Sequence, residues 1–277
     1  MNQQPPFRIY RQPELKASSL VVGWTEDAGR LGPRVIDYLN RELGGEEFGE
    51  IEPTDFFPLS SVSVESDVAQ FPESKFYSCA AKGLVTFKSS APRFEWHRFL
   101  QSVLDVAEHY CHATEVYAIG GMVTMGPHTI PRELLGVANC AEMKGVLGQY
   151  SLATPLDYET PPDQKPTFNS FLLWVALRRG LPGAGLWVPV PFYLAAADDP
   201  QAWRKMIDFL DRRLGLGIDL THLDAEVARQ NEMLAQLRSG SSDIDSCISK
   251  LESNQTPSDE ENENLVREVQ HLFSRRH

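Results

Sequence analysis

One loop in the sequence carries the residue types of a small-ligand site. It starts with two glycines at the end of the apolar run EVYAIGG and continues to GPHTIP, where a histidine and a threonine stand between prolines. Open α/β sheets bind ligands where their strands end, because the loops there form a crevice. The candidate ligand-binding residues, including one at the end of an earlier strand, are Thr25, Gly120, Gly121, His128 and Thr129. A stiff structural or interface loop is the competing interpretation, and the residue types name no reaction.

A second glycine-rich segment, LVVGWTEDAGRLGPRVIDYL, joins an expected strand to an expected helix. Backbone amides at the start of a helix attract phosphates, but this segment has neither the GxxxxGK[ST] nor the GxGxxG pattern of phosphate-binding loops. Glu26 and Asp27 lie in the same loop, and their charges oppose an anion. We therefore predict that Gly23, Gly29 and Gly32 let the chain turn and do not cradle a phosphate.

Other groupings of reactive side chains are weak. EHYCH (residues 108–112) holds four potential metal ligands, but histidines at a helix end also cap its last carbonyls, and no second ligand cluster has a known spacing. Glu52 and Asp55 could form a carboxylate pair or bond backbone amides in a turn. The sequence has no GxSxG elbow, and no cysteine lies in a recognisable nucleophile motif. We predict no catalytic residue, no metal and no cofactor.

Alternating strands and helices must position these residues. Short apolar runs predict strands, and apolar spacings of three and four predict helices between them. The expected strands lie at 20–24, 115–121 and 184–190, a two-stranded hairpin at 74–90, and helices at 33–43, 94–111, 169–180 and 200–214. Asn169 or Ser170 is expected to cap the third helix, and Asp199, followed by Pro200, the fourth. This alternation predicts a mostly parallel sheet covered by helices on both faces.

The chain changes character after Ile218. A heptad-like apolar stripe follows, formed by Leu220, Leu223, Val227, Leu234 and Leu237. SGSSD interrupts this pattern, and SNQTPSDEENEN forms a polar break between two further apolar stripes. The last 59 residues hold 12 acidic and 6 basic side chains. We predict an α/β domain over 1–218 and an acidic helical interaction tail over 219–277, either folded back on the core or shared between subunits.

Composition excludes several classes of function. The 277-residue chain has a formal net charge of −12 and no Lys/Arg run longer than two, which argues against nucleic-acid and anionic-membrane partners. The most apolar segment, AGLWVPVPFYLAAA, is too short to span a bilayer, and the N-terminus lacks a signal-peptide pattern. The four cysteines form no CxxC pair, as is typical of reduced thiols. We expect a cytoplasmic protein.

Six segments in order resemble the proteasome assembly chaperone 2 family, in its bacterial and archaeal branch. They are LVVGW with LGPRVIDYLNRELG, IEPTDFF, EVYAIGG, GPHTIP, LWVPVPFYLAAADDPQAW and LGLGIDLTHL, and they extend over residues 20–223. The resemblance implies a three-layer α/β/α sandwich related to the nucleoside-phosphorylase-like folds, followed by a C-terminal helical region, and it implies homo-oligomers. His128 matches the family's form, whereas Phe192 stands where bacterial members often have a histidine.

The resemblance also implies a role. Eukaryotic members of the family are not enzymes; they bind proteasome α subunits and guide ring assembly. We therefore expect a non-enzymatic, assembly-chaperone-like protein that self-associates and presents its loops and tail to a protein partner. Two alternatives stay open. One is a small-ligand binder or a hydrolase- or phosphorylase-like enzyme that uses the strand-end pocket near His128, and the other is a purely structural oligomer held together by its tail.

Overall fold

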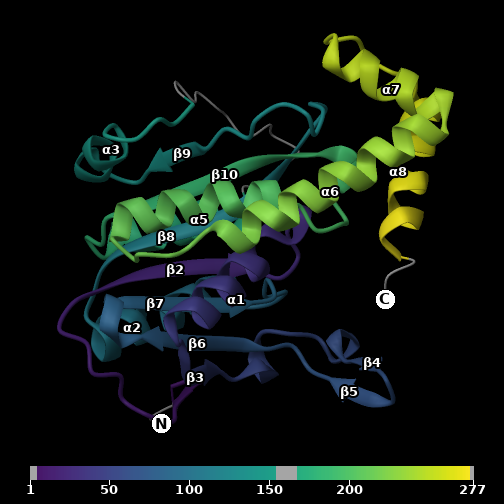
Figure 1. Cartoon of the computed structure of the whole chain (residues 1–277). Coiled ribbons are helices and arrows are strands. Elements are labelled where there is room, and N and C mark those ends of the chain that lie inside the picture. Colours follow the sequence, from purple (N-terminus) through teal and green to yellow (C-terminus); the bar gives the residue numbers. More distant parts are fainter. Residues whose placement is uncertain (1–4, 154–166, 275–277) are drawn as a thin grey trace.

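A computed structural model describes residues 5–153 and 167–274 of the chain (Figure 1). Its centre is one eight-stranded sheet. The strands are β1 (Phe7–Ile9), β2 (Ser18–Trp24), β3 (Glu46–Ile51), β6 (Ser74–Cys79), β7 (Leu84–Ser89), β8 (Ala113–Thr124), β9 (Leu135–Ala138) and β10 (Gly183–Pro191). Their order across the sheet is β1-β3-β6-β7-β2-β8-β10-β9, so strands distant in the sequence become neighbours.

Four neighbouring strands, β7, β2, β8 and β10, run parallel to one another. β6 pairs antiparallel with β7, and β9 pairs antiparallel with β10. Beyond β6, β3 and then β1 continue the sheet, each antiparallel to its neighbour. The residues from Val116 to Ile119 on β8 are fully buried, as is typical of a parallel strand covered on both faces. The mostly parallel sheet and the 74–90 hairpin are therefore confirmed. The hairpin turn ends on Gly83, whose φ of +59° suits glycine.

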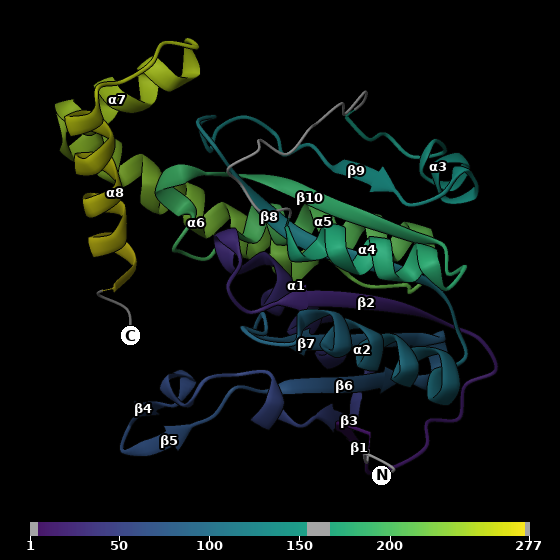
Figure 2. The ribbon, with the colours of Figure 1, turned by 180° about the vertical axis from the view of Figure 1, so that it is seen from behind.

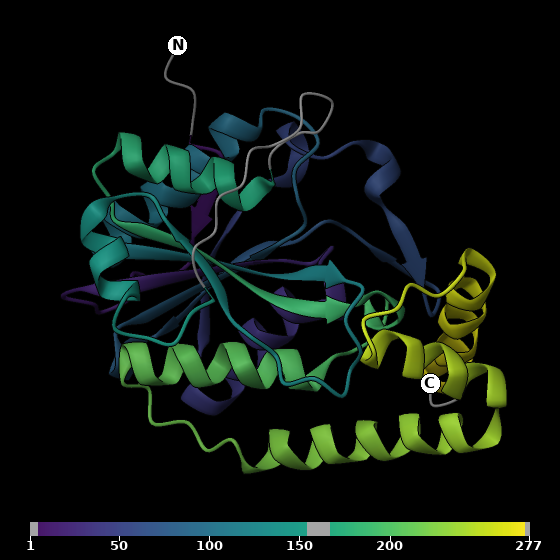
Figure 3. The same cartoon turned by 90° about the horizontal axis from the view of Figure 1, so that it is seen from above.

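Helices cover both faces of the sheet, as Figures 2 and 3 show. One face carries α1 (Leu31–Leu43) and α5 (Pro200–Leu214), and the other carries α2 (Trp96–Cys111) and α4 (Phe168–Arg178). Successive side chains of β2 alternate between the two layers. Val21 joins the core beneath α1 and α5, whereas Leu20 and Val22 join the core beneath α2 and α4. The predicted α/β/α arrangement is thus confirmed.

Local capping explains where two of these helices begin. Asp199 caps α5 as predicted, because its side chain accepts the N–H of Ala202 and Pro200 follows at the first helical position. The predicted cap of α4 is wrong. Thr167 caps that helix by accepting the N–H of Ser170, whereas Asn169 is buried in the first turn and accepts the indole N–H of Trp24 at 2.6 Å.

The tail forms three helices that fold back on the same chain (Figure 3). They are α6 (Thr221–Gly240), α7 (Ser242–Glu252) and α8 (Asp259–Ser274). α6 packs against α5, and α8 contacts the short 3-10 helix η5 (Phe192–Leu194) that precedes α5. The expected boundary at 218 falls between α5 and α6. Within the described residues, no helix combines the length and hydrophobicity needed to cross a bilayer.

The predicted polar break is wrong in its second half, because α8 already begins at Asp259. Three acidic residues, 259–261, occupy the first turn of that helix. Negative side chains are favourable there, because they interact favourably with the positive end of the helix dipole.

Other elements were not predicted. A hairpin of β4 (Ser63–Glu65) and β5 (Val68–Gln70) forms a separate two-stranded sheet that extends away from the body (Figures 1 and 2). A short helix, α3 (Ala141–Leu147), follows β9. These pieces are too short for a hydrophobic period to stand out in the sequence.

Candidate functional site

Asp27 occupies the strand end that the sequence marked for a ligand. It lies between β2 and the 3-10 helix η1 (Ala28–Arg30), next to Gly121 of β8. Its carboxylate accepts the backbone N–H groups of Ala28 (3.0 Å), Gly32 (2.8 Å) and Gly121 (2.9 Å). Burial raises the pKa of this carboxyl to about 6, although the three amide bonds act in the opposite direction. The amides that an external anion would use are therefore bonded to a side chain of the chain itself.

The glycines around Asp27 allow backbone segments to approach closely. A Cβ on Gly121 would lie 2.2 Å from the carbonyl oxygen of Ala28, and one on Gly32 would lie 2.9 Å from that of Trp24. A Cβ on Gly23 would lie 2.7 Å from the carbonyl oxygen of Gly32. The steric role predicted for Gly23 and Gly32 is confirmed. The sequence predicts only that the charge of Asp27 repels an anion. It does not predict that this carboxylate accepts the amides itself, because Gly121 lies 94 positions away in the chain.

Thr25 faces a different neighbourhood from the glycines of β8. Its hydroxyl lies 2.8 Å from that of Ser90, and the two residues line a cavity of about 740 Å³ together with Phe57 and Lys88. Gly120 is buried, and a Cβ there would contact Asn169 and Asp27 at 3.4 Å.

His128 is enclosed by the protein, with 5% of its surface exposed. The Tyr193 hydroxyl oxygen accepts the backbone N–H of His128 (2.7 Å) and lies 2.8 Å from its Nδ1. Burial, followed by the charges of Arg132 and Arg238, lowers the pKa of the imidazole to about 4. The ring is therefore neutral at physiological pH.

A buried ion pair and a contact with the tail surround this histidine. Arg132 donates to Asp199 at 2.9 Å, and both side chains are almost fully buried. The Thr129 hydroxyl donates to Glu252 of α7 at 2.9 Å, and Glu252 also accepts from Arg238 of α6 at 2.8 Å. The five candidate residues thus fall into three settings: Thr25 with Ser90, the two glycines with Asp27, and the His128–Thr129 pair between Tyr193 and the tail. Their role in binding a ligand stays a prediction.

The tail stripe packs mainly inward. Leu223 and Leu234 are buried in the apolar core that also contains α1 and α5, while Leu220, Val227 and Leu237 are half-buried. Of the two arrangements left open by the sequence, the structure has the tail folded back on its own core.

In the other reactive groupings, the carboxylates pair with arginines. Asp55 pairs with Arg98 at 3.0 Å, and Glu52 pairs with Arg8. In EHYCH, Glu108 accepts from Arg179 at 2.7 Å. Among residues 5–153 and 167–274, no three His, Cys, Asp or Glu side chains gather as a metal site would require.

Beyond Asp27, the end of β8 exposes apolar side chains. We use the name β8 tip for the residues Met122, Val123, Met125 and Ile130, whose exposed fractions lie between 43% and 55%. Thr129, which bonds to α7, directly precedes the last of them. The β8 tip therefore adjoins the tail at the open end of the sheet.

Comparisons with known proteins give a family through a family model and a fold through solved structures. The model of the PAC2 family matches residues 20–238. No curated protein matches the sequence.

Three solved structures superpose on most of the chain. Mycobacterium tuberculosis Rv2714, a protein of unknown function, has a TM-score of 0.77 at 18% identity, over 92% of this chain and 90% of its own. The M. tuberculosis proteasome-assembly chaperone homologue Rv2125 has a TM-score of 0.66 at 18% identity, over 79% and 94% of the two chains. Pyrococcus furiosus PbaB, an archaeal proteasome activator, has a TM-score of 0.67 at 19% identity, over 83% and 97%. At these identities the structural likeness establishes the fold.

Proposed function

The chain belongs to the PAC2 family, and from that premise we propose that it is a non-enzymatic, assembly-chaperone-like protein that binds another protein. The resemblance found in the sequence motifs is thereby confirmed. The names of two similar structures, a proteasome-assembly chaperone homologue and a proteasome activator, make a proteasome subunit one candidate partner. Homo-oligomerisation belongs to the same proposal, as does a cytoplasmic location, which the four free cysteines suit.

The observation that carries this proposal is the position of the Asp27 carboxylate. Ligands of open α/β sheets sit at strand ends on backbone amides, and here Asp27 accepts those amides itself. The same end of the sheet instead presents the exposed β8 tip. This arrangement supports recognition of a protein surface at the strand ends.

The composition of the β8 tip suits a protein contact. Met122 and Met125 have flexible, polarisable side chains that adapt to a partner surface. Grouped exposed apolar residues on a soluble protein mark interaction surfaces. The contact between Thr129 and Glu252 holds the tail beside this tip, so a partner bound there would border both the body and the tail.

The test is affinity capture from a lysate of the source organism, read by mass spectrometry. The baits are the wild-type chain, the double variant Met122→Glu/Met125→Glu, and the control Leu177→Glu. Leu177 lies on α4 and is 48% exposed, so the control adds a charge to an equally exposed apolar position away from the β8 tip. We expect one protein at stoichiometric yield with the wild type and the control, and its loss with the double variant.

Light scattering on the same three proteins distinguishes a foreign partner from a second copy of the chain. A wild-type oligomer that the double variant dissociates would make the partner a second copy. If all three baits capture the same protein at the same yield, the β8 tip does not bind the partner. Recovery of the chain alone, as a monomer, would contradict the interaction role and return attention to the small-ligand prediction near His128.

A further inference from the structure

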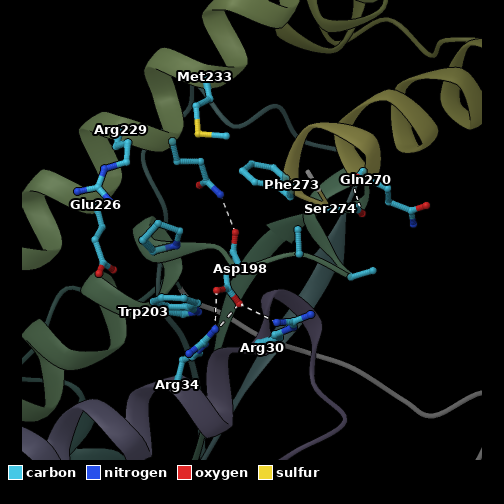
Figure 4. Close-up of a pocket in the computed structure, with 14 residues that line it drawn as sticks. Arg30, Arg34, Asp198, Trp203, Glu226, Arg229, Met233, Gln270, Phe273 and Ser274 are labelled. Atoms are coloured by element: carbon cyan, nitrogen blue, oxygen red, sulfur yellow. Dashed lines mark hydrogen bonds and ion pairs between the residues drawn. The ribbon is translucent and has the colours of Figure 1, made fainter. Parts of the chain in front are cut away.

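A cavity of about 470 Å³ lies where the tail meets the body (Figure 4). We call it the junction cavity. Its lining comes from η1 and α1, from α5 and the connection between η5 and α5, and from helices α6 and α8. The volume falls within the range of small-molecule sites, and the cavity is separate from the strand end held by Asp27 and from the β8 tip.

Three arginines line the junction cavity of this acidic chain: Arg30, Arg34 and Arg229. Arg34 donates to Asp198 at 2.8 Å, and Arg30 reaches the same carboxylate at 3.6 Å. One carboxylate therefore serves two guanidinium groups, each of which has five N–H donors. Within the described part of the chain, Arg229 forms no ion pair, and the remaining acid of the lining, Glu226, lies 3.4 Å from the imidazole of His222. Three arginines therefore face two carboxylates in the lining. The lining thus keeps spare donors and an excess of positive charge.

The backbone at Arg30 is unusual for an arginine. Its φ is +50°, in the left-handed region, directly after Gly29 at +64°. Glycine adopts this conformation at little cost, whereas a residue with a Cβ is strained in it. The guanidinium of Arg30 lies at the N-terminus of α1. There it approaches Asp198 together with the guanidinium of Arg34 (Figure 4).

Apolar side chains complete the cavity next to these arginines. Trp203 is held in place because its indole N–H donates to the carbonyl oxygen of Gly29 at 2.7 Å. The guanidinium of Arg34 lies over its ring at 5.5 Å. Met233 of α6 and Phe273 of α8 add apolar surface from the tail. A ligand that fits this lining carries a negative group at one end and an apolar ring or chain at the other.

We propose that the junction cavity binds a small organic anion, with its carboxylate, phosphate or sulfonate held by the positive charge of the arginines that line the cavity and its apolar part against Trp203, Met233 and Phe273. Because Arg30, Arg34 and Trp203 belong to the body and the other contacts to the tail, the bound ligand ties the two together. This site does not depend on the proposed function.

The test uses the full chain and 8-anilinonaphthalene-1-sulfonate, an aromatic sulfonate whose fluorescence rises in apolar surroundings. Arg229→Ala removes a guanidinium that is exposed and makes no ion pair within the described residues. Arg30→Gly removes another and relieves the left-handed backbone, so neither variant is expected to unfold the protein, as thermal melting will check. Arg178→Ala, at an exposed position of α4 outside the cavity, is the matched control.

We expect the wild type and Arg178→Ala to bind one equivalent of the dye. Arg229→Ala and Arg30→Gly should each bind it about ten-fold more weakly, as the loss of a charge-assisted hydrogen bond implies. Hydrogen exchange in α8 should slow when the wild type is saturated, because Phe273 lines the cavity. Equal affinity in all four proteins, no saturable binding, or unchanged exchange in α8 would overturn the proposal.

Discussion

At the scale of single residues, Asp27 and Gly121 together hold the segment around Ala28 against the end of β8. The carboxylate bonds to the Gly121 N–H, and the missing side chain of Gly121 lets the carbonyl of Ala28 approach. The two effects depend on each other, because the bond requires the close approach. Glycine at 121 is therefore a packing requirement of the fold, whatever binds nearby.

We predict that Gly121→Ala lowers the free energy of unfolding by about 2–3 kcal/mol, the cost of forcing an extra methyl into packed structure. The added Cβ would lie 2.2 Å from a backbone oxygen, which cannot rotate away. Gly126→Ala, five residues later, is the control, since its Cβ would meet only the side chain of Thr124 at 3.7 Å or more. Urea denaturation of both variants measures the difference, and equal stability would show that β8 and η1 can separate without cost.

At the scale of elements, α6 determines how the tail sits on the body. Leu234 is fully buried against the core, while Leu237, one turn later, is only half-buried. Arg238 adds polar contacts to Asp245 and Glu252 of α7, but such part-exposed ion pairs contribute little. Apolar burial is the main source of stability at this interface.

We predict that Leu234→Ala costs about 2–4 kcal/mol of stability, as buried leucines do, and Leu237→Ala at most about 1 kcal/mol, because less of its side chain leaves water. Denaturation by urea at two protein concentrations, ten-fold apart, is the measurement. Since the tail packs within one chain, the loss should be the same at both concentrations. A loss that shrinks at the higher concentration would mean that the tail is shared between subunits.

The helix caps show how far the sequence determines an element. Asp199 and Pro200 are adjacent in the chain and begin α5 as predicted, because capping involves neighbours only. Asn169 has the same capping chemistry, but it bonds to Trp24, 145 positions away. The strand that carries Trp24 therefore decides the role of Asn169, and no local pattern records it.

At the scale of the whole molecule, two buried titratable groups act on stability in opposite directions. The pKa of Asp27 is raised to about 6. Between about pH 4 and 6 the folded chain holds a proton that the unfolded chain has lost, so this group makes stability fall as pH rises. The pKa of His128 is lowered to about 4. Over nearly the same range the unfolded chain holds the extra proton, so this group makes stability rise with pH.

We predict that Asp27→Asn makes the free energy of unfolding rise more steeply with pH between 4 and 6, and that His128→Asn makes it rise less steeply or fall. Each change in slope has a limit of about 1.4 kcal/mol per pH unit, the value for one proton. Urea denaturation at pH 4, 5, 6 and 7 tests both variants against the wild type. The two variants serve as controls for each other, and profiles parallel to the wild type would show that neither group is buried as described.

The sequence by itself determined the alternation of strands and helices, the parallel centre of the sheet, the α5 cap, the break at SGSSD and the family motifs. These features depend on spacing and on neighbours within a few positions. Only the tertiary structure decided which residues share a site. It brought Asp27 to Gly121, His128 to Tyr193, and the tail to Arg30 and Arg34 of the junction cavity. The physical reason is that strand order and close packing join residues far apart in the chain, and hydrophobic spacing records which face of an element is buried but not what covers it.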